Sequence, residues 1–152
     1  LFGAMEPIDK ANLLGAFLAH SIYTIVILIF IARLIGKPHL GHYLGLFLMI
    51  TVIPLVYLMI IAPSLERAPL YYIQISLMLV YLVVELLLDY ILKVEFRNVR
   101  WIAILYVMLF FAGSGGMIGI ASQAGSIWSV SAVILFIVMV ILAFVQRAVV
   151  GM

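Results

Sequence analysis

The sequence contains no cysteine and very little charge. Charged residues make up 9% of the chain and hydrophobic residues 68%. The lack of cysteine excludes disulfides, thiolate metal sites and thiol catalysis. His20 is the only histidine inside a long apolar segment, so the paired helix histidines of a diheme cytochrome are missing and we expect no cofactor. The 8 basic residues are too sparse for a nucleic-acid surface, so we expect no nucleic-acid partner.

The composition is instead that of an integral membrane protein. Soluble domains are roughly 45–50% apolar and about 25% charged, and the mean hydropathy of this chain is +1.40. Membrane lipids are therefore its first expected partners. Residues 1–4 resemble a remnant of cloning before a start at Met5. We expect residues 5–152 to form a single transmembrane domain.

Five apolar stretches reach the roughly 20 residues that a helix needs to cross a bilayer. They cover residues 12–35, 43–62, 70–92, 101–121 and 126–147. We therefore predict an all-α protein, a bundle of five transmembrane helices. Pro54 predicts a kink in the second span that leaves the Ile50 carbonyl short of its partner. The turn at 122–126 is uncharged, and its alternative is a re-entrant pair.

The basic residues divide unequally between the two sides of such a bundle. Alternating crossings place six on one side: Arg33, Lys37, Lys93, Arg97, Arg100 and Arg147. Only Lys10 and Arg67 fall on the other side. The positive-inside rule then predicts that the N-terminus lies outside and the C-terminus in the cytoplasm. We expect a multi-pass protein of the cell membrane.

The third span alone carries acidic residues within its apolar length. At 100° per residue, Gln74, Met78, Tyr81, Glu85 and Asp89 fall within an arc of roughly 80°, so one stripe of this helix is polar from end to end. Charged side chains at bilayer depth cost from a few kcal/mol upward. The stripe should therefore face the bundle interior or a wet cavity.

The two carboxylates of this stripe receive different interpretations. Asp89 lies roughly 5 Å from the cytoplasmic end of the span, where an ion pair with Lys93 and Arg33 explains it. Glu85 lies roughly 10 Å inside the span. Its charge must be compensated by a cation or removed by protonation. A proton carrier, ion ligand or substrate contact and a structural hydrogen bond are both open for Glu85.

The histidines fall into two groups. By depth, His20 should meet the outer half of the third span near Gln74 to Tyr81, either as a satisfied neutral imidazole or as a proton relay. His39 and His42 belong to a short cytoplasmic loop. Together with the carboxylates they could bind zinc, but the spacing is not diagnostic and we predict no metal site.

Small residues in the fourth span predict close helix packing. Gly115 and Gly119 form a small-xxx-small ridge, and Gly116 lies between them. The same glycines could instead unwind the helix and expose its backbone to a ligand.

Three functions are compatible with these features. The first is a small transporter or carrier, proton-linked, with a path along Gln74, Tyr81, Glu85 and Asp89 and with His20 opposite. The second is an enzyme for a lipid or isoprenoid, with Glu85 or His20 as acid or base and Arg97 and Arg100 on an anionic head group. The third is a non-catalytic subunit that binds a membrane protein partner or a second copy through its glycine ridge. The expected ligand is an ion, a small molecule or a lipid.

Overall fold

The computed structural model describes residues 6–91 and 100–150. Their helices are α1 (Pro7–Leu34), α2 (Pro38–Met49), α3 (Val52–Ile61), the 3-10 turn η2 (Pro63–Leu65), α4 (Pro69–Glu85), the π-helical turn η3 (Leu86–Ile91), α5 (Arg100–Ser122) and α6 (Ser126–Val150). Within these residues, five helices are long and apolar enough to cross a membrane: Pro7–Leu34, Pro38–Ile61, Pro69–Leu88, Arg100–Ser122 and Ser126–Val149. The five predicted helices are therefore confirmed, with ends that differ by a few residues.

Proline and glycine set the ends of the helices. Pro7, Pro38 and Pro69 lie in the first turn of α1, α2 and α4, where a missing N–H costs nothing and the fixed φ suits the helix. Gly36 follows α1 with a φ of +76°, the left-handed conformation that ends many helices. Gly125 has a φ of +136° between α5 and α6. The turn at 122–126 thus separates two full-length helices, not a re-entrant pair.

The second span is broken in its middle, as Pro54 predicts. Ile50 and Thr51 lie between α2 and α3. Thr51 donates its hydroxyl to the Leu48 carbonyl at 2.7 Å. The Ile50 carbonyl, which we expected to lack a partner, accepts the N–H of Ile53 at 3.2 Å. A local tightening of the helix therefore compensates for the N–H that proline lacks.

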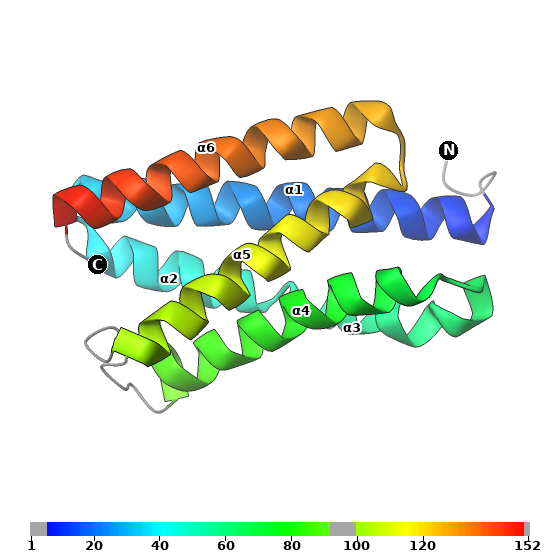
Figure 1. Cartoon of the computed structure of the whole chain (residues 1–152), viewed down its shortest axis with the longest axis horizontal. Coiled ribbons are helices and arrows are strands. Elements are labelled where there is room, and N and C mark those ends of the chain that lie inside the picture. The colour runs from blue at the N-terminus through cyan, green and yellow to red at the C-terminus, as the bar shows by residue number, and fades with distance from the viewer. Residues whose placement is uncertain (1–5, 92–99, 151–152) are drawn as a thin grey trace.

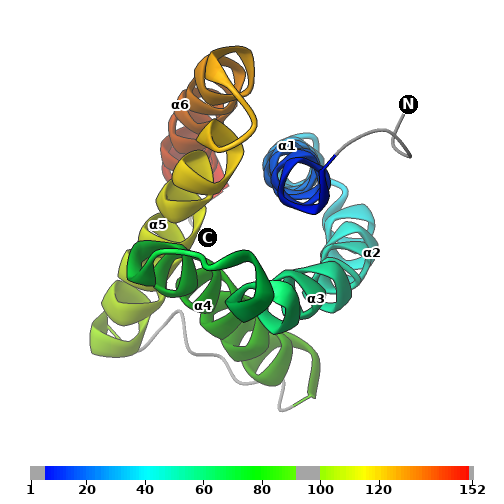
Figure 2. The ribbon, with the colours of Figure 1, turned by 90° about the vertical axis from the view of Figure 1, so that its right-hand side faces the viewer.

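α1 is the most buried of the five spans, with half of its apolar stretch inside the protein. It contacts α2, α3, α5 and α6, while α4 and α5 form the most extensive helix pair. α5 and α6 meet at the 123–125 turn and diverge toward their other ends (Figure 1). Seen along the bundle, α5 and α6 form one wall, and α2, α3 and α4 curve around the opposite side of α1 (Figure 2).

The two ends of the bundle differ in charge. The start of α1 and the end of α6 lie at opposite ends (Figure 1). Among the described residues, the end where α1 and α6 finish carries Arg33, Lys37, Arg100 and Arg147. The other end carries Glu6, Asp9, Lys10, Glu66 and Arg67. Lys93 and Arg97, which were also predicted on the basic side, lie outside the described residues.

The glycine run of α5 packs mainly against α4. A Cβ on Gly113 would lie 3.2 Å from the Leu77 carbonyl oxygen, and one on Gly116 would lie 3.4 Å from Cα of Gln74. A Cβ on Gly119 would overlap the Gln74 amide. Gly115 instead faces α6, where a Cβ would meet only the Phe136 ring at 3.9 Å. α5 stays helical throughout this run, so the glycines do not unwind it.

Candidate functional site

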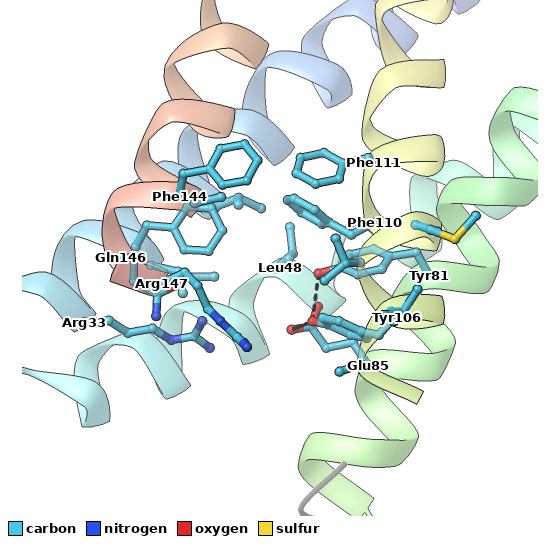
Figure 3. Close-up of a pocket in the computed structure, with 18 residues that line it drawn as sticks. Arg33, Leu48, Tyr81, Glu85, Tyr106, Phe110, Phe111, Phe144, Gln146 and Arg147 are labelled. Atoms are coloured by element: carbon cyan, nitrogen blue, oxygen red, sulfur yellow. Dashed lines mark hydrogen bonds between the residues drawn. The ribbon is translucent and has the colours of Figure 1, made fainter. Parts of the chain in front are cut away.

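A cavity of about 400 Å³ lies at the basic end of the bundle, among α1, α2, α4, α5 and α6. Its walls are mostly apolar and aromatic, and its polar groups gather at one end (Figure 3). α5 and α6 diverge from the turn that joins them (Figure 1). The cavity lies toward the ends where these two helices are farther apart.

One side of the polar end is a hydrogen-bonded chain between α4 and α5. Glu85, which is 9% exposed, ends the regular α-helix of α4. Tyr106 donates its hydroxyl to Oε1 of Glu85 at 3.0 Å. The hydroxyls of Tyr81 and Tyr106 are 3.2 Å apart. Either hydroxyl can be the donor in this second bond.

Arginines from two other helices face the same end of the cavity. Arg33 lies in the last turn of α1 and Arg147 in the last turn of α6. In Figure 3 both guanidinium groups lie toward the end of the cavity that holds Glu85, away from the rings of Phe111 and Phe144. Gln146, which is 2% exposed, lines the cavity beside Arg147.

The apolar end of the cavity is formed by phenylalanine rings. Phe110 lies 5.2 Å from Phe111 and 5.2 Å from Tyr81, measured between ring centroids. Phe111 stacks on Phe144 of α6 at 6.4 Å. These contacts join α4, α5 and α6. Apart from the polar groups at the other end, the described residues that line the cavity offer a ligand no polar side chain.

The cavity also reaches the outer surface of the bundle. Ile104 and Met108 of α5 and Phe144 of α6 line it, yet they are 50%, 62% and 65% exposed. On a chain that spans a membrane, such outward-facing apolar side chains contact lipid tails. Outward-facing side chains of α5 and α6 therefore border the cavity on this side.

The predicted polar stripe of the third span is not one continuous site. Tyr81 and Glu85 line the cavity, but Gln74 packs against Gly116 and Gly119 farther along α4. Met78, between Gln74 and Tyr81 on the stripe, is fully buried. From Met78 toward the start of α4, the stripe therefore consists of packed side chains and does not extend the cavity.

The 100° step that assigns Asp89 to the stripe does not apply to this residue, because its backbone belongs to the π-helical turn Leu86–Ile91. The hydrogen bonds of a π-helix join residues five apart, so the 100° step does not hold there. The side chain of Asp89 and all of Lys93 lie outside the described residues. Of the predicted ion pair, only Arg33 is described, and it lines the cavity.

His20 contacts α6, whereas we expected it to face the third span. Its Nδ1 donates to the Ala16 carbonyl at 2.8 Å, and its Nε2 lies 2.6 Å from the Ser131 hydroxyl, which also donates to the Ile127 carbonyl at 2.9 Å. Trp128 lies edge-on to the imidazole at 5.1 Å. Both ring nitrogens are thus engaged away from Glu85, and His20 does not line the cavity.

The two histidines that we expected in a loop lie in a helix instead. His39 and His42 lie in α2, and both are exposed. Among the residues that the structure describes, no group of three or more His, Cys, Asp or Glu side chains could hold a metal ion. Arg100, predicted to hold a head group, does not line the cavity, and Arg97 lies outside the described residues.

Sequence reasoning missed Tyr106, Gln146 and Arg147 as site residues. Tyr106 places a hydroxyl six residues into the fourth span, and Gln146 and Arg147 place two polar groups at the end of the fifth. Their depth was a usable signal, since all three lie near the basic end that holds Glu85. Comparison of the chain with protein-family models, with curated proteins and with solved structures found no match.

Proposed function

We propose that the chain is a multi-pass membrane protein that binds an amphipathic, lipid-like ligand in the cavity among α1, α2, α4, α5 and α6. The observation that carries this proposal is the cavity itself, with phenylalanines at one end and Glu85, Arg33 and Arg147 at the other. Exposed side chains of α5 and α6 border it on one side. Such a lining matches a ligand that has one apolar chain and one polar head.

The orientation follows from charge. The end with Arg33, Lys37, Arg100 and Arg147 is the cytoplasmic one in this proposal, by the positive-inside rule. The N-terminus is then outside and the C-terminus inside the cell. The cavity opens toward the cytoplasmic leaflet, from which the ligand enters.

Transfer of the tail provides little driving force. Lipid tails are about as apolar as leucine, so an acyl chain that moves from the bilayer into the cavity gains no hydrophobic free energy. Close packing against Phe110, Phe111 and Phe144 contributes to binding, and the head group decides which ligand is retained. The polar end of the cavity is therefore the specificity element.

A carrier is the first form of this function. Lateral access through Ile104, Met108 and Phe144 supports it, because a carrier must load from the membrane without exposing the tail to water. An enzyme that acts on the same ligand is the second form. The Tyr81, Tyr106 and Glu85 chain favours it, because a carboxylate in a cavity wall can take or give a proton.

Photolabelling of the protein in nanodiscs tests the binding proposal. A hexadecanol with a mid-chain diazirine should label peptides from residues 103–111 and 143–147, which line the cavity. Ala143→Trp fills the cavity and should abolish this labelling, whereas Ala148→Trp lies outside the lining and should retain it. Labelling spread over all outward-facing helices, unchanged by Ala143→Trp, would refute the proposal.

Mass spectrometry of the ligand separates carrier from enzyme. Ligand recovered unchanged after incubation, together with transfer between vesicle populations, supports a carrier. A time-dependent mass change that is lost in Glu85→Gln supports an enzyme.

A further inference from the structure

We infer that the cavity selects a ligand with a single apolar chain and an anionic head, a carboxylate or a phosphate, held between Arg33 of α1 and Arg147 of α6. This inference rests on the proposed ligand-binding function and names the class of ligand. It is carried by the two arginines, which come from contacting helices and share one end of the cavity (Figure 3).

Among the described side chains, which do not include that of Asp89, no ion pair of Arg33 or Arg147 is found. Arg33 is half-buried and Arg147 exposed. A guanidinium presents planar, paired donors that match a carboxylate or phosphate. Two of them from adjacent helices can surround one anionic head from two directions.

The charge of the lining favours an anion in either state of Glu85. With Glu85 ionised, two arginines and one glutamate sum to a net positive charge, and with Glu85 protonated the lining is more positive still. Glu85 is also held by the Tyr106 hydroxyl on the α4 and α5 side of the cavity. A lipophilic cation, attracted by Glu85 and the aromatic rings, would have to approach both arginines.

The size of the cavity favours one chain over two. Its volume of about 400 Å³ is near the lower end of the roughly 300–1,000 Å³ of small-molecule sites. A fatty acid or an isoprenoid phosphate therefore fits better than a two-chain phospholipid.

Competition among ligands that share one alkyl chain tests the charge of the head. Palmitic acid, hexadecyl phosphate, hexadecanol and hexadecyltrimethylammonium compete with the photoreactive hexadecanol for labelling of residues 103–111. We expect the two anions to compete at concentrations lower by about tenfold or more than the alcohol, since a charge-assisted hydrogen bond contributes about 1.5–3 kcal/mol. The cation should be the weakest competitor. The ratio between the two anions tells the carboxylate from the phosphate.

Charge variants assign the preference to the two arginines. Arg33→Gln and Arg147→Gln should each reduce the preference for anions about tenfold, and Arg33→Lys should restore part of it. Arg100→Gln removes a charge at the same end but outside the lining, and should leave the preference unchanged. Exposed Arg147 provides the decisive variant if Arg33→Gln fails to fold.

The outcomes separate the two proposals. Absent cavity labelling by hexadecanol overturns the binding function itself. Cavity labelling with equal competition by alcohol and anions, or with stronger competition by the cation, leaves the binding function standing and overturns the inferred anionic head. An anion preference that Arg100→Gln removes as fully as Arg147→Gln also overturns it, because the effect is then one of surface charge.

Discussion

The Tyr106 hydroxyl on α5 lies 3.0 Å from Oε1 of Glu85 on α4 and donates a hydrogen bond to it. This contact joins the most extensive helix pair of the protein and lies in the wall of the cavity. One phenol therefore contributes to both helix packing and the orientation of the only acidic side chain described in the cavity lining.

Removal of this hydroxyl should destabilise the protein. Tyr106→Phe leaves Glu85 with one donor fewer, and we expect the free energy of unfolding to fall by about 1–3 kcal/mol. SDS titration in bicelles, followed by circular dichroism, measures the change. In a double-mutant cycle with Glu85→Gln, a coupling energy near zero would show that the bond contributes nothing. Tyr57→Phe, at a tyrosine that is 53% exposed, is the matched control.

Two glycines of one run should differ in their tolerance of a methyl group. Gly113→Ala brings a Cβ within 3.2 Å of the α4 backbone, which cannot rotate away, so we expect a loss of about 1–3 kcal/mol in the free energy of unfolding. Gly115→Ala meets only the Phe136 ring at 3.9 Å and should be neutral. Equal effects of the two substitutions in the same SDS titration would contradict the packing of α5 on α4.

The hydrogen bond between His20 and Ser131 should contribute to the packing of α1 on α6. Interhelical bonds of this kind contribute about 0.6 kcal/mol on average and up to about 1.7 in membranes. We expect Ser131→Ala to lower the free energy of unfolding by an amount in this range. Ser129→Ala, for which no side-chain hydrogen bond is described, should change it by less than Ser131→Ala does. Larger loss with Ser129→Ala would assign the stabilisation elsewhere.

Reporter fusions test the proposed orientation. A green fluorescent protein fused after residue 152 should fluoresce, because it folds in the cytoplasm. Alkaline phosphatase at the same position should be inactive. Fusion of both reporters within the 122–126 turn should give the opposite pattern. Active phosphatase at the C-terminus would reverse the orientation and place the cavity in the outer leaflet.

The features that could be predicted from sequence are those that depend on length and depth. A bilayer imposes a minimum length on each helix, so five apolar stretches and the uncharged 122–126 turn indicated five spans, and Pro54 indicated the break in the second. The depth of Glu85 similarly indicated a residue that must face the interior. Tyr81 and Glu85 could thus be assigned to one site before their neighbours were known.

The identity of the neighbours could not be predicted. Depth along a helix says nothing about which other helix lies beside it, so His20 was expected to face the third span although it bonds to Ser131 of α6. From sequence, the depth of Arg33 indicates an ion pair with Asp89. Arg147 contributes only to the unequal division of basic residues that predicts the orientation. The convergence of these two arginines on one cavity depends on the contact between α1 and α6, which no local pattern encodes.

The polar partners of α1 have a consequence for biosynthesis. Tyr23 donates to the Ser114 carbonyl and His20 bonds to Ser131, which lie 91 and 111 residues later in the chain. At a synthesis rate of about 5–20 residues per second, the first helix waits roughly 5–20 s before Ser131 is made. During that interval Nε2 of His20 and the Tyr23 hydroxyl lack their native partners on α6 and α5, although polar groups are costly to leave against hydrocarbon. The first span must therefore be shielded by the insertion machinery, by water or by lipid head groups until the last hairpin arrives.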